Sequence, residues 1–159
     1  MLRKGIKANW SLLKKVETDP HYDRTKATLL LKSFVDGHVQ TIAKKVALMV
    51  EHFNGQVAHL IDGKAKAMIV TRSRLHAVRY KQVVDRYLKE KGYPYKALVA
   101  FSGTVSDGGI DYTETHMNGF SETQTAETFK QQQYRILIVA NKFQTGFDQP
   151  LLHTMYVDT

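Results

Sequence analysis

Cysteine is absent from this chain of 159 residues, which excludes disulfide bonds and thiolate-bound metal sites. No stretch of about 18 consecutive apolar residues occurs, so the sequence predicts no membrane-spanning helix. Acidic residues are fewer than basic ones: the chain has 15 Asp and Glu and 23 Lys and Arg, which gives a net charge of +8. That balance favours polyanionic partners such as nucleic acid. We expect a cytoplasmic protein with one domain that buries a sizeable core.

Hydrophobic periodicity predicts helices that alternate with strands. Apolar residues from 39 to 53 recur at i, i+3, i+4 and i+7, which predicts a helix that ends at Asn54-Gly55. A second, longer helix with apolar positions between Leu75 and Leu88 should end at Gly92. Short apolar runs predict four strands, at 66–71, 95–101, 136–140 and 153–158.

The remaining segments carry weaker patterns. Residues 10–17 and 24–35 have helical character on either side of a breaker, TDPHYD. Residues 102–120 are rich in turn formers and show neither the helical nor the strand period of apolar residues, which predicts an extended loop. Ser121 should cap a short helix after that loop.

The order of these elements predicts an α/β fold, with a parallel sheet flanked by helices and a helical N-terminal segment. The last residue of the chain, Thr159, directly follows the last predicted strand, whereas a doubly wound domain normally continues into a helix. We therefore expect a fragment of a longer chain that is incomplete at its C-terminal end.

Polar clusters follow three of the predicted strands. They are Thr71-Arg72-Ser73, Ser102-Gly103-Thr104 and the segment from Asn141 to Asp148. The carboxyl ends of neighbouring parallel strands meet at one edge of a sheet, and open α/β sheets bind their ligands there. The sequence therefore predicts one site built from all three clusters.

The first cluster is suited to an anion. Ser73 or Thr71 can cap the following helix, which leaves backbone amides and Arg72 facing a group such as a phosphate. Arg74 and Arg79 on that helix add positive charge. The alternative is that Ser73 is only an N-cap and that the arginines form a solvated face.

The third cluster combines four features in one short loop. Gly146 permits a close backbone approach and Pro150 fixes the exit of the chain. Thr145 offers a hydroxyl group and Asp148 a carboxylate. A plain strand-to-helix turn is the alternative, although such a turn does not need all four residues.

Other kinds of site have little support in the sequence. Asp107, Asp111 and Glu114 lack the spacing of a calcium loop, so a flexible acidic loop is expected there. The histidines have no third ligand nearby, and no metal site is expected. Gly63-Lys64 does not complete a phosphate-loop pattern, and no arrangement of Ser, His and Asp suggests covalent hydrolysis.

Two stretches resemble a known family. KAMIVTRSRLHAVRYK (66–81) resembles motif IV and RILIVANKFQTGFDQPLLHTMYVD (135–158) resembles motif V of the second RecA-like domain of superfamily 2 helicase motors. Within that group the likeness is to the motor (R) subunit of type I restriction enzymes. The preceding helical residues resemble the segment that joins the two motor lobes. The resemblance thus implies a lead-in at residues 1–60 and a partial second RecA-like domain at 61–159.

This resemblance implies an ATP-driven translocase that pulls duplex DNA toward an endonuclease, as part of a type I site-specific deoxyribonuclease. By position, Thr145 would contact the DNA backbone, while Asp148 would face the nucleotide between the lobes. The implied DNA contacts are Thr71, Arg72, Ser73, Ser102, Gly103 and Thr145, and the implied nucleotide contacts are Gly146 and Asp148. The loop from Asn141 to Asp148 is one residue shorter than the commonest form, which leaves Asn141 and Lys142 without an assigned role.

The rest of the motor has no counterpart in this sequence. A phosphate loop, an Asp-Glu pair for magnesium, the motif VI arginines and a nuclease centre are all missing. The resemblance therefore implies that ATP and Mg bind mainly to the first lobe in the full-length motor, with no cofactor in this chain alone. An isolated piece should neither hydrolyse ATP nor cut DNA.

The resemblance also implies partners, and two alternatives stay open. The partners would be duplex DNA, the first RecA-like lobe of the same parent chain, and the modification and specificity subunits, with no membrane. One alternative is a free-standing basic α/β module that binds nucleic acid without chemistry. The other is a small-ligand doubly wound protein with a closed pocket.

Overall fold

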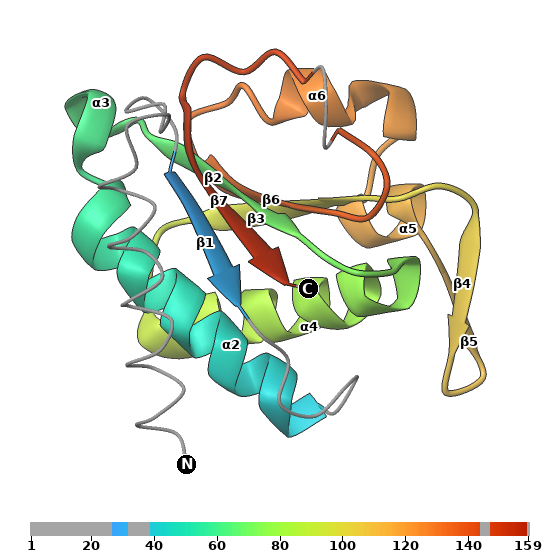
Figure 1. Ribbon diagram of the computed structural model, residues 1–159. Helices are drawn as coiled ribbons and strands as arrows, with labels where there is room; N and C mark the ends of the chain where they lie inside the picture. The colour runs from blue at the N-terminus through green and yellow to red at the C-terminus, as the bar shows by residue number, and fades with distance from the viewer. Residues whose placement is uncertain (1–26, 32–38, 144–146, 159) are drawn as a thin grey trace.

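The computed structural model describes residues 27–31, 39–143 and 147–158. Five parallel strands form one sheet in the order β1-β7-β2-β6-β3. These strands are β1 (Ala27–Leu31), β2 (Lys66–Val70), β3 (Lys96–Ala100), β6 (Tyr134–Val139) and β7 (Leu152–Asp158). The predicted α/β fold with a parallel sheet flanked by helices is confirmed (Figure 1).

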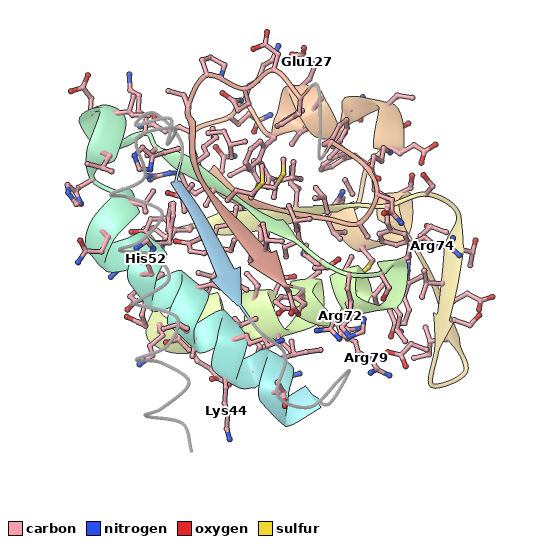
Figure 2. All side chains as sticks on the ribbon, in the orientation of Figure 1. Lys44, His52, Arg72, Arg74, Arg79 and Glu127 are labelled. Atoms are coloured by element: carbon pink, nitrogen blue, oxygen red, sulfur yellow. The ribbon has the colours of Figure 1, made fainter. Side chains whose placement is uncertain are left out.

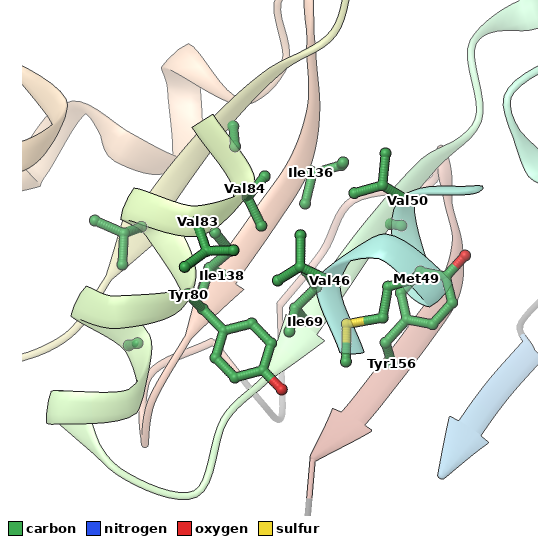
Figure 3. Packing of buried hydrophobic residues seen from close by; sticks show 14 of the residues in the cluster. Val46, Met49, Val50, Ile69, Tyr80, Val83, Val84, Ile136, Ile138 and Tyr156 are labelled. Carbon is green, nitrogen blue, oxygen red and sulfur yellow. The ribbon is translucent and has the colours of Figure 1, made fainter. Parts of the chain in front are cut away.

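Two long helices cover one face of the sheet. α2 (Val39–His52) and α4 (Arg74–Lys91) pack against each other and lie below the sheet in Figure 1. In Figure 3, Val46 of α2 and Val84 of α4 meet Ile138 of β6 in a buried core. Full burial of one such side chain contributes about 1.5–3 kcal/mol. Many of them together hold both helices on the sheet.

A smaller core lies on the opposite face of the sheet. Here Met68, Leu98 and Leu137 of the central strands pack with Phe129 and Leu152. Short helical turns and the chain after β6 lie over this face (Figure 1). The turns are η2 (Glu122–Gln124) and α6 (Thr125–Thr128). Because both faces are covered, the central strands read as nearly continuous apolar runs.

Most elements lie where the periodicity predicts them. α2 runs into a π-helical turn, η1 (Phe53–Val57), and a short helix, α3 (Leu60–Gly63), leads to β2. The Ser73 hydroxyl caps α4 by accepting from the His76 amide, and Gly92 ends the helix at φ 68°. Ser121 caps η2, as predicted.

The helix expected at residues 24–35 is wrong where the structure describes it. Residues 27–31 form β1, which pairs in parallel with β7 from Ala27 opposite Thr154 to Leu31 opposite Asp158. A run of consecutive apolar residues carries no period, so pairing with a distant strand decides its conformation. The helix expected at 10–17 lies outside the described residues. β1 and α2, which precede residue 61, share the sheet and core with the elements after it.

The extended loop expected at 102–120 is also wrong. This segment forms a hairpin of β4 (Thr104–Asp107) and β5 (Ile110–Thr113), followed by α5 (Glu114–Asn118). Gly108 and Gly109 connect the strands with φ of +60° and +80°, conformations that glycine adopts without strain. The hairpin stands away from the main sheet (Figure 1).

Among the helices that the structure describes, none is both long and apolar enough to cross a bilayer.

Candidate functional site

The three strands that precede the polar clusters end side by side at one edge of the sheet, as predicted. β6 lies between β2 and β3, so their carboxyl ends are neighbours. Pairing continues to the last residues, since the Thr71 amide donates to the Val139 carbonyl at 2.9 Å and the Ala140 amide to the Ala100 carbonyl at 3.1 Å. We call this carboxyl edge, with the residues that follow β2, β6 and β3, the rim.

Thr71 and Ser73 are engaged in backbone contacts at the rim. Thr71 is buried, and its hydroxyl lies 2.9 Å from the Val139 carbonyl oxygen and 3.1 Å from that of Ser73. The Thr71 side chain therefore ties β2 to β6 and does not face solvent. Ser73 lies 2.7 Å from His76 Nδ1 in addition to its capping contact. Ser73 caps only the His76 amide, and the amides before it in the first turn have no acceptor within an α-helix, so this helix end is suited to an anion.

Arg74 connects α4 to the cluster after β3. Its Nη1 donates to the Ser102 carbonyl at 2.8 Å, and the Ser102 residue is exposed. Gly103 has φ +72°, and a Cβ there would stand 3.0 Å from Arg74 Nη1. Glycine at this position therefore permits both the left-handed turn and the close approach of the guanidinium.

Arg79 is held by the hairpin. Its Nε and Nη2 lie 3.2 and 3.3 Å from the two carboxylate oxygens of Asp107. Figure 2 shows Arg72, Arg74 and Arg79 gathered near the start of α4. The three arginines therefore lie close to the rim, and Arg79 among them is paired with Asp107 of β4.

A buried charged cluster lies at the carboxyl end of β7, the strand next to β2. Asp158 Oδ1 accepts from Lys45 Nζ at 2.7 Å and from Arg72 Nη2 at 3.2 Å, and the Tyr80 hydroxyl donates to Oδ2 at 2.7 Å. The Asp158 side chain is 1% exposed and that of Arg72 is 23% exposed. Burial alone would raise the pKa of Asp158, but the hydrogen bonds from Lys45, Tyr80 and Arg72 outweigh it and lower the pKa.

Sequence reasoning missed Lys45, Tyr80 and Asp158. A signal for Lys45 was available, because it lies three residues after Ile42 and four before Met49, both buried on the same side of α2. A lysine on the apolar face of a helix needs a buried partner. Nothing in the local sequence identifies Asp158 as that partner, since the two residues are 113 positions apart.

The loop after β6 is fixed at its start by Lys142. Lys142 Nζ donates to Glu114 Oε1 at 2.9 Å, and the buried Glu114 also accepts from Thr125 Oγ1 at 2.6 Å. Asn141 and Phe143 have φ of 55° and 62°, which non-glycine residues adopt at some cost. Lys142, which had no role by sequence, thus anchors the loop to α5.

Asp148 is exposed in the loop that returns to β7. Nearby, Phe147 packs on Phe143 with ring centroids 5.0 Å apart. Thr145 and Gly146 lie outside the described residues, so their predicted roles stay predictions.

The acidic residues considered for calcium have protein partners instead. Asp107 pairs with Arg79, Asp111 accepts from the Ser106 hydroxyl, and Glu114 pairs with Lys142. The flexible acidic loop expected there is therefore wrong. Within the described residues, no three His, Cys, Asp or Glu side chains are placed to hold a metal ion.

Two surface pockets lie away from the rim. One lies beside the edge strand β3 and includes Lys96 and Met117, and the other lies between Phe120 and Tyr134. Neither is lined by a residue of the three polar clusters. The rim residues therefore do not contribute to either of these pockets.

Comparison with known proteins identifies relatives in one archaeon, Methanocaldococcus jannaschii. The endonuclease subunit named for the type I restriction enzyme MjaIXP is 38% identical over 112 residues, which cover 68% of this chain and 10% of that protein. Those named for MjaVIIP and MjaVIIIP are 29% and 26% identical and cover 87% and 85% of this chain.

The chain spans only 10–14% of the length of these curated relatives. No family model matches the chain. No solved structure matches it either.

Proposed function

We propose that this chain is part of the endonuclease subunit of a type I restriction enzyme, namely the second RecA-like lobe of its ATP-dependent DNA translocase, in the cytoplasm. In this role the rim contacts the DNA backbone, and the loop after β6 contacts nucleotide. The names of the three relatives support the restriction-enzyme part of the proposal. The resemblance of residues 66–81 and 135–158 to motifs IV and V supports the motor part.

One observation carries the proposal: the rim gathers cations where three adjacent strands end. Arg72 and Arg74 lie at the start of α4, whose capped N-terminus adds the partial positive charge of its amides. Ser102 and Gly103 lie within reach of the Arg74 guanidinium. A backbone phosphate fits such a surface, because arginines and helix N-termini both bind phosphate oxygens.

The nucleotide side of the proposal rests on the loop after β6. Asp148 is exposed, so its carboxylate is accessible to a ligand or to a second lobe. We assign nucleotide contacts to Asp148 and Gly146, and a DNA contact to Thr145, from the family resemblance. ATP and Mg would bind mainly to the first lobe of the parent chain. That lobe and the modification and specificity subunits are the proposed protein partners.

In the motor, this chain's own residues would hold the DNA backbone. Lys142 fixes the start of the loop on Glu114, so a shift of the loop is coupled to α5 and the end of β3. Closure of a second lobe onto Asp148 would then change how the rim holds phosphate. Only such a difference between two states can convert nucleotide turnover into movement.

DNA binding by the 159-residue chain tests the rim. Wild type should bind duplex DNA weakly, and the affinity should fall steeply as salt concentration rises. Arg72→Gln should weaken binding of any DNA sequence and reduce the salt slope by about one. Arg86→Gln is the matched control, because Arg86 is exposed on α4 about three turns from the rim. A salt-independent affinity, or equal effects of both variants, would contradict the proposal.

ATP turnover by the full-length subunit tests Asp148. Asp148→Ala should lower DNA-dependent ATP hydrolysis without unfolding the chain, since an exposed carboxylate adds little to stability. Glu127→Ala is the control, because Glu127 is an exposed carboxylate on the opposite side of the view from Arg72 (Figure 2). Unchanged turnover in Asp148→Ala would remove Asp148 from the nucleotide contacts.

A further inference from the structure

The cluster around Asp158 has more positive than negative charge. Lys45 and Arg72 both donate to one carboxylate oxygen of Asp158. Two cations and one carboxylate sum to +1, whereas an Arg72–Asp158 pair alone would be neutral. An arginine neutralised by its own carboxylate attracts a phosphate poorly, so the second cation matters for anion binding.

The other titratable groups beside this cluster do not change that sum near neutral pH. Burial, and then the charge of Arg72, lower the pKa of His76, which favours the neutral ring. Burial raises the pKa of Tyr80, so its hydroxyl keeps the proton that it donates to Asp158. Arg79, the next cation along the rim, is paired with Asp107 on the hairpin. The local charge therefore depends on Lys45, Arg72 and Asp158.

The burial of these side chains decides which of them a ligand can reach. Lys45 is 8% exposed and Asp158 1% exposed, so these two cannot meet a large ligand such as DNA, whereas Arg72 is 23% exposed. The carboxylate is also held from the other side by Tyr80. A charged hydrogen bond to a fixed, buried carboxylate restricts the guanidinium to few orientations.

We propose that Asp158 and Lys45 are positioning residues for Arg72 at a site for a DNA backbone phosphate. Asp158 holds the Arg72 guanidinium at the carboxyl end of β2, and Lys45 offsets the carboxylate charge so that the site stays cationic. This inference rests on the proposed function, because it assumes that the rim binds the DNA backbone. It adds two residues from α2 and β7 that do not touch the DNA.

The test compares two adjacent lysines of α2 in the 159-residue chain. Lys45→Met and Lys44→Met remove the same charge, but Lys44 is exposed and points away from the molecule in Figure 2. We expect Lys45→Met to reduce the salt slope of duplex DNA binding by about one, as Arg72→Gln does. Lys44→Met should change it by less than about half as much. A Lys45→Arg variant should bind DNA like wild type, because it keeps the positive charge at this position.

Tyr80→Phe provides a second measurement that leaves the net charge unchanged. It removes only the hydrogen bond to Asp158 Oδ2, so binding should weaken although no charge is lost. Thermal unfolding of each variant shows whether it is folded, and Tyr80→Phe decides the question if Lys45→Met does not fold. Normal binding by Tyr80→Phe would then overturn the inference.

The outcomes separate this inference from the proposed function. If wild type binds DNA and Arg72→Gln weakens it, but Lys45→Met behaves like Lys44→Met, only the positioning role fails. If Arg72→Gln leaves binding unchanged, Arg72 is not the contact and the inference is overturned. If wild type does not bind DNA, both are overturned.

Discussion

Glu114 is a single buried carboxylate that holds three parts of the chain together. Its Oε1 accepts from the Phe101 amide and from Lys142, both at 2.9 Å, while Oε2 accepts from Thr125. The side chain is 1% exposed. A buried carboxylate is tolerated only when hydrogen bonds and a cation offset its desolvation. Glu114 meets both conditions, which explains why an acidic residue lies inside the fold.

Replacement of Glu114 should therefore destabilise the protein strongly. Glu114→Ala leaves the Phe101 amide and the Thr125 hydroxyl without their acceptor, so we expect a loss of about 2–4 kcal/mol. Glu122→Ala is the matched control, because Glu122 is exposed and lies 3.9 Å from the same Lys142; it should cost less than about 0.5 kcal/mol. Urea unfolding measures both. Similar losses in the two variants would show that Lys142 alone governs the effect.

At the scale of elements, β3 is the last strand of the sheet and has one open edge. The Asn118 side chain closes part of that edge, since Oδ1 accepts from the Val99 amide at 3.0 Å and Nδ2 donates to the Val99 carbonyl at 2.7 Å. Glu114 covers the Phe101 amide next to it. Side chains of α5 thus satisfy the backbone groups that a further strand would otherwise bind.

Asn118→Ala should expose this edge. We expect a loss of about 1–3 kcal/mol, because two backbone groups of Val99 lose their partners. The variant should also self-associate more than wild type, since open strand edges pair with other chains. Urea unfolding and light scattering measure the two effects. His116→Ala, an exposed substitution on the same helix, should change neither; an Asn118→Ala chain as stable and monomeric as that control would contradict the prediction.

The elements that sequence predicted well carry their signals locally. The strand at 66–70 is an apolar run bounded by turn formers, and Ser73 and Gly92 mark the ends of α4. β1 was missed because its conformation depends on β7, which lies more than 100 residues away. The Asp107-Gly108-Gly109 sequence did signal the hairpin, since two glycines in a row suit a two-residue turn. Its polar composition was instead interpreted as a loop.

The candidate site also has a part that the sequence predicted and a part that it did not. The rim followed from strand ends alone, because a parallel sheet brings the ends of adjacent strands together. The buried cluster did not follow, because Lys45 and Asp158 meet only after α2 and β7 have packed. A residue's presence at an edge is therefore readable from sequence, but its charged partners across the fold are not.

For the chain as a whole, we expect three histidines to make the fold sensitive to acid. Burial lowers the pKa of His52 to about 4, with a further contribution from His153. Burial also lowers the pKa of His153 and of His76. Each ring resists protonation in the folded chain, whereas the unfolded chain protonates its histidines near pH 6.5. Below that pH the unfolded state binds more protons, so stability falls as the pH falls.

His52 should supply a measurable share of this acid sensitivity. With a pKa of about 4 in the folded chain and about 6.5 in the unfolded chain, it should lower stability by about 2 kcal/mol between pH 7.5 and pH 5. In His52→Gln that share should disappear, while the amide can still bond the Tyr156 hydroxyl, which lies 2.7 Å from His52 Nδ1. Urea unfolding at both pH values measures the difference. His59→Gln, at an exposed position, should keep the wild-type pH dependence; the same dependence in His52→Gln would show that other groups cause the acid sensitivity.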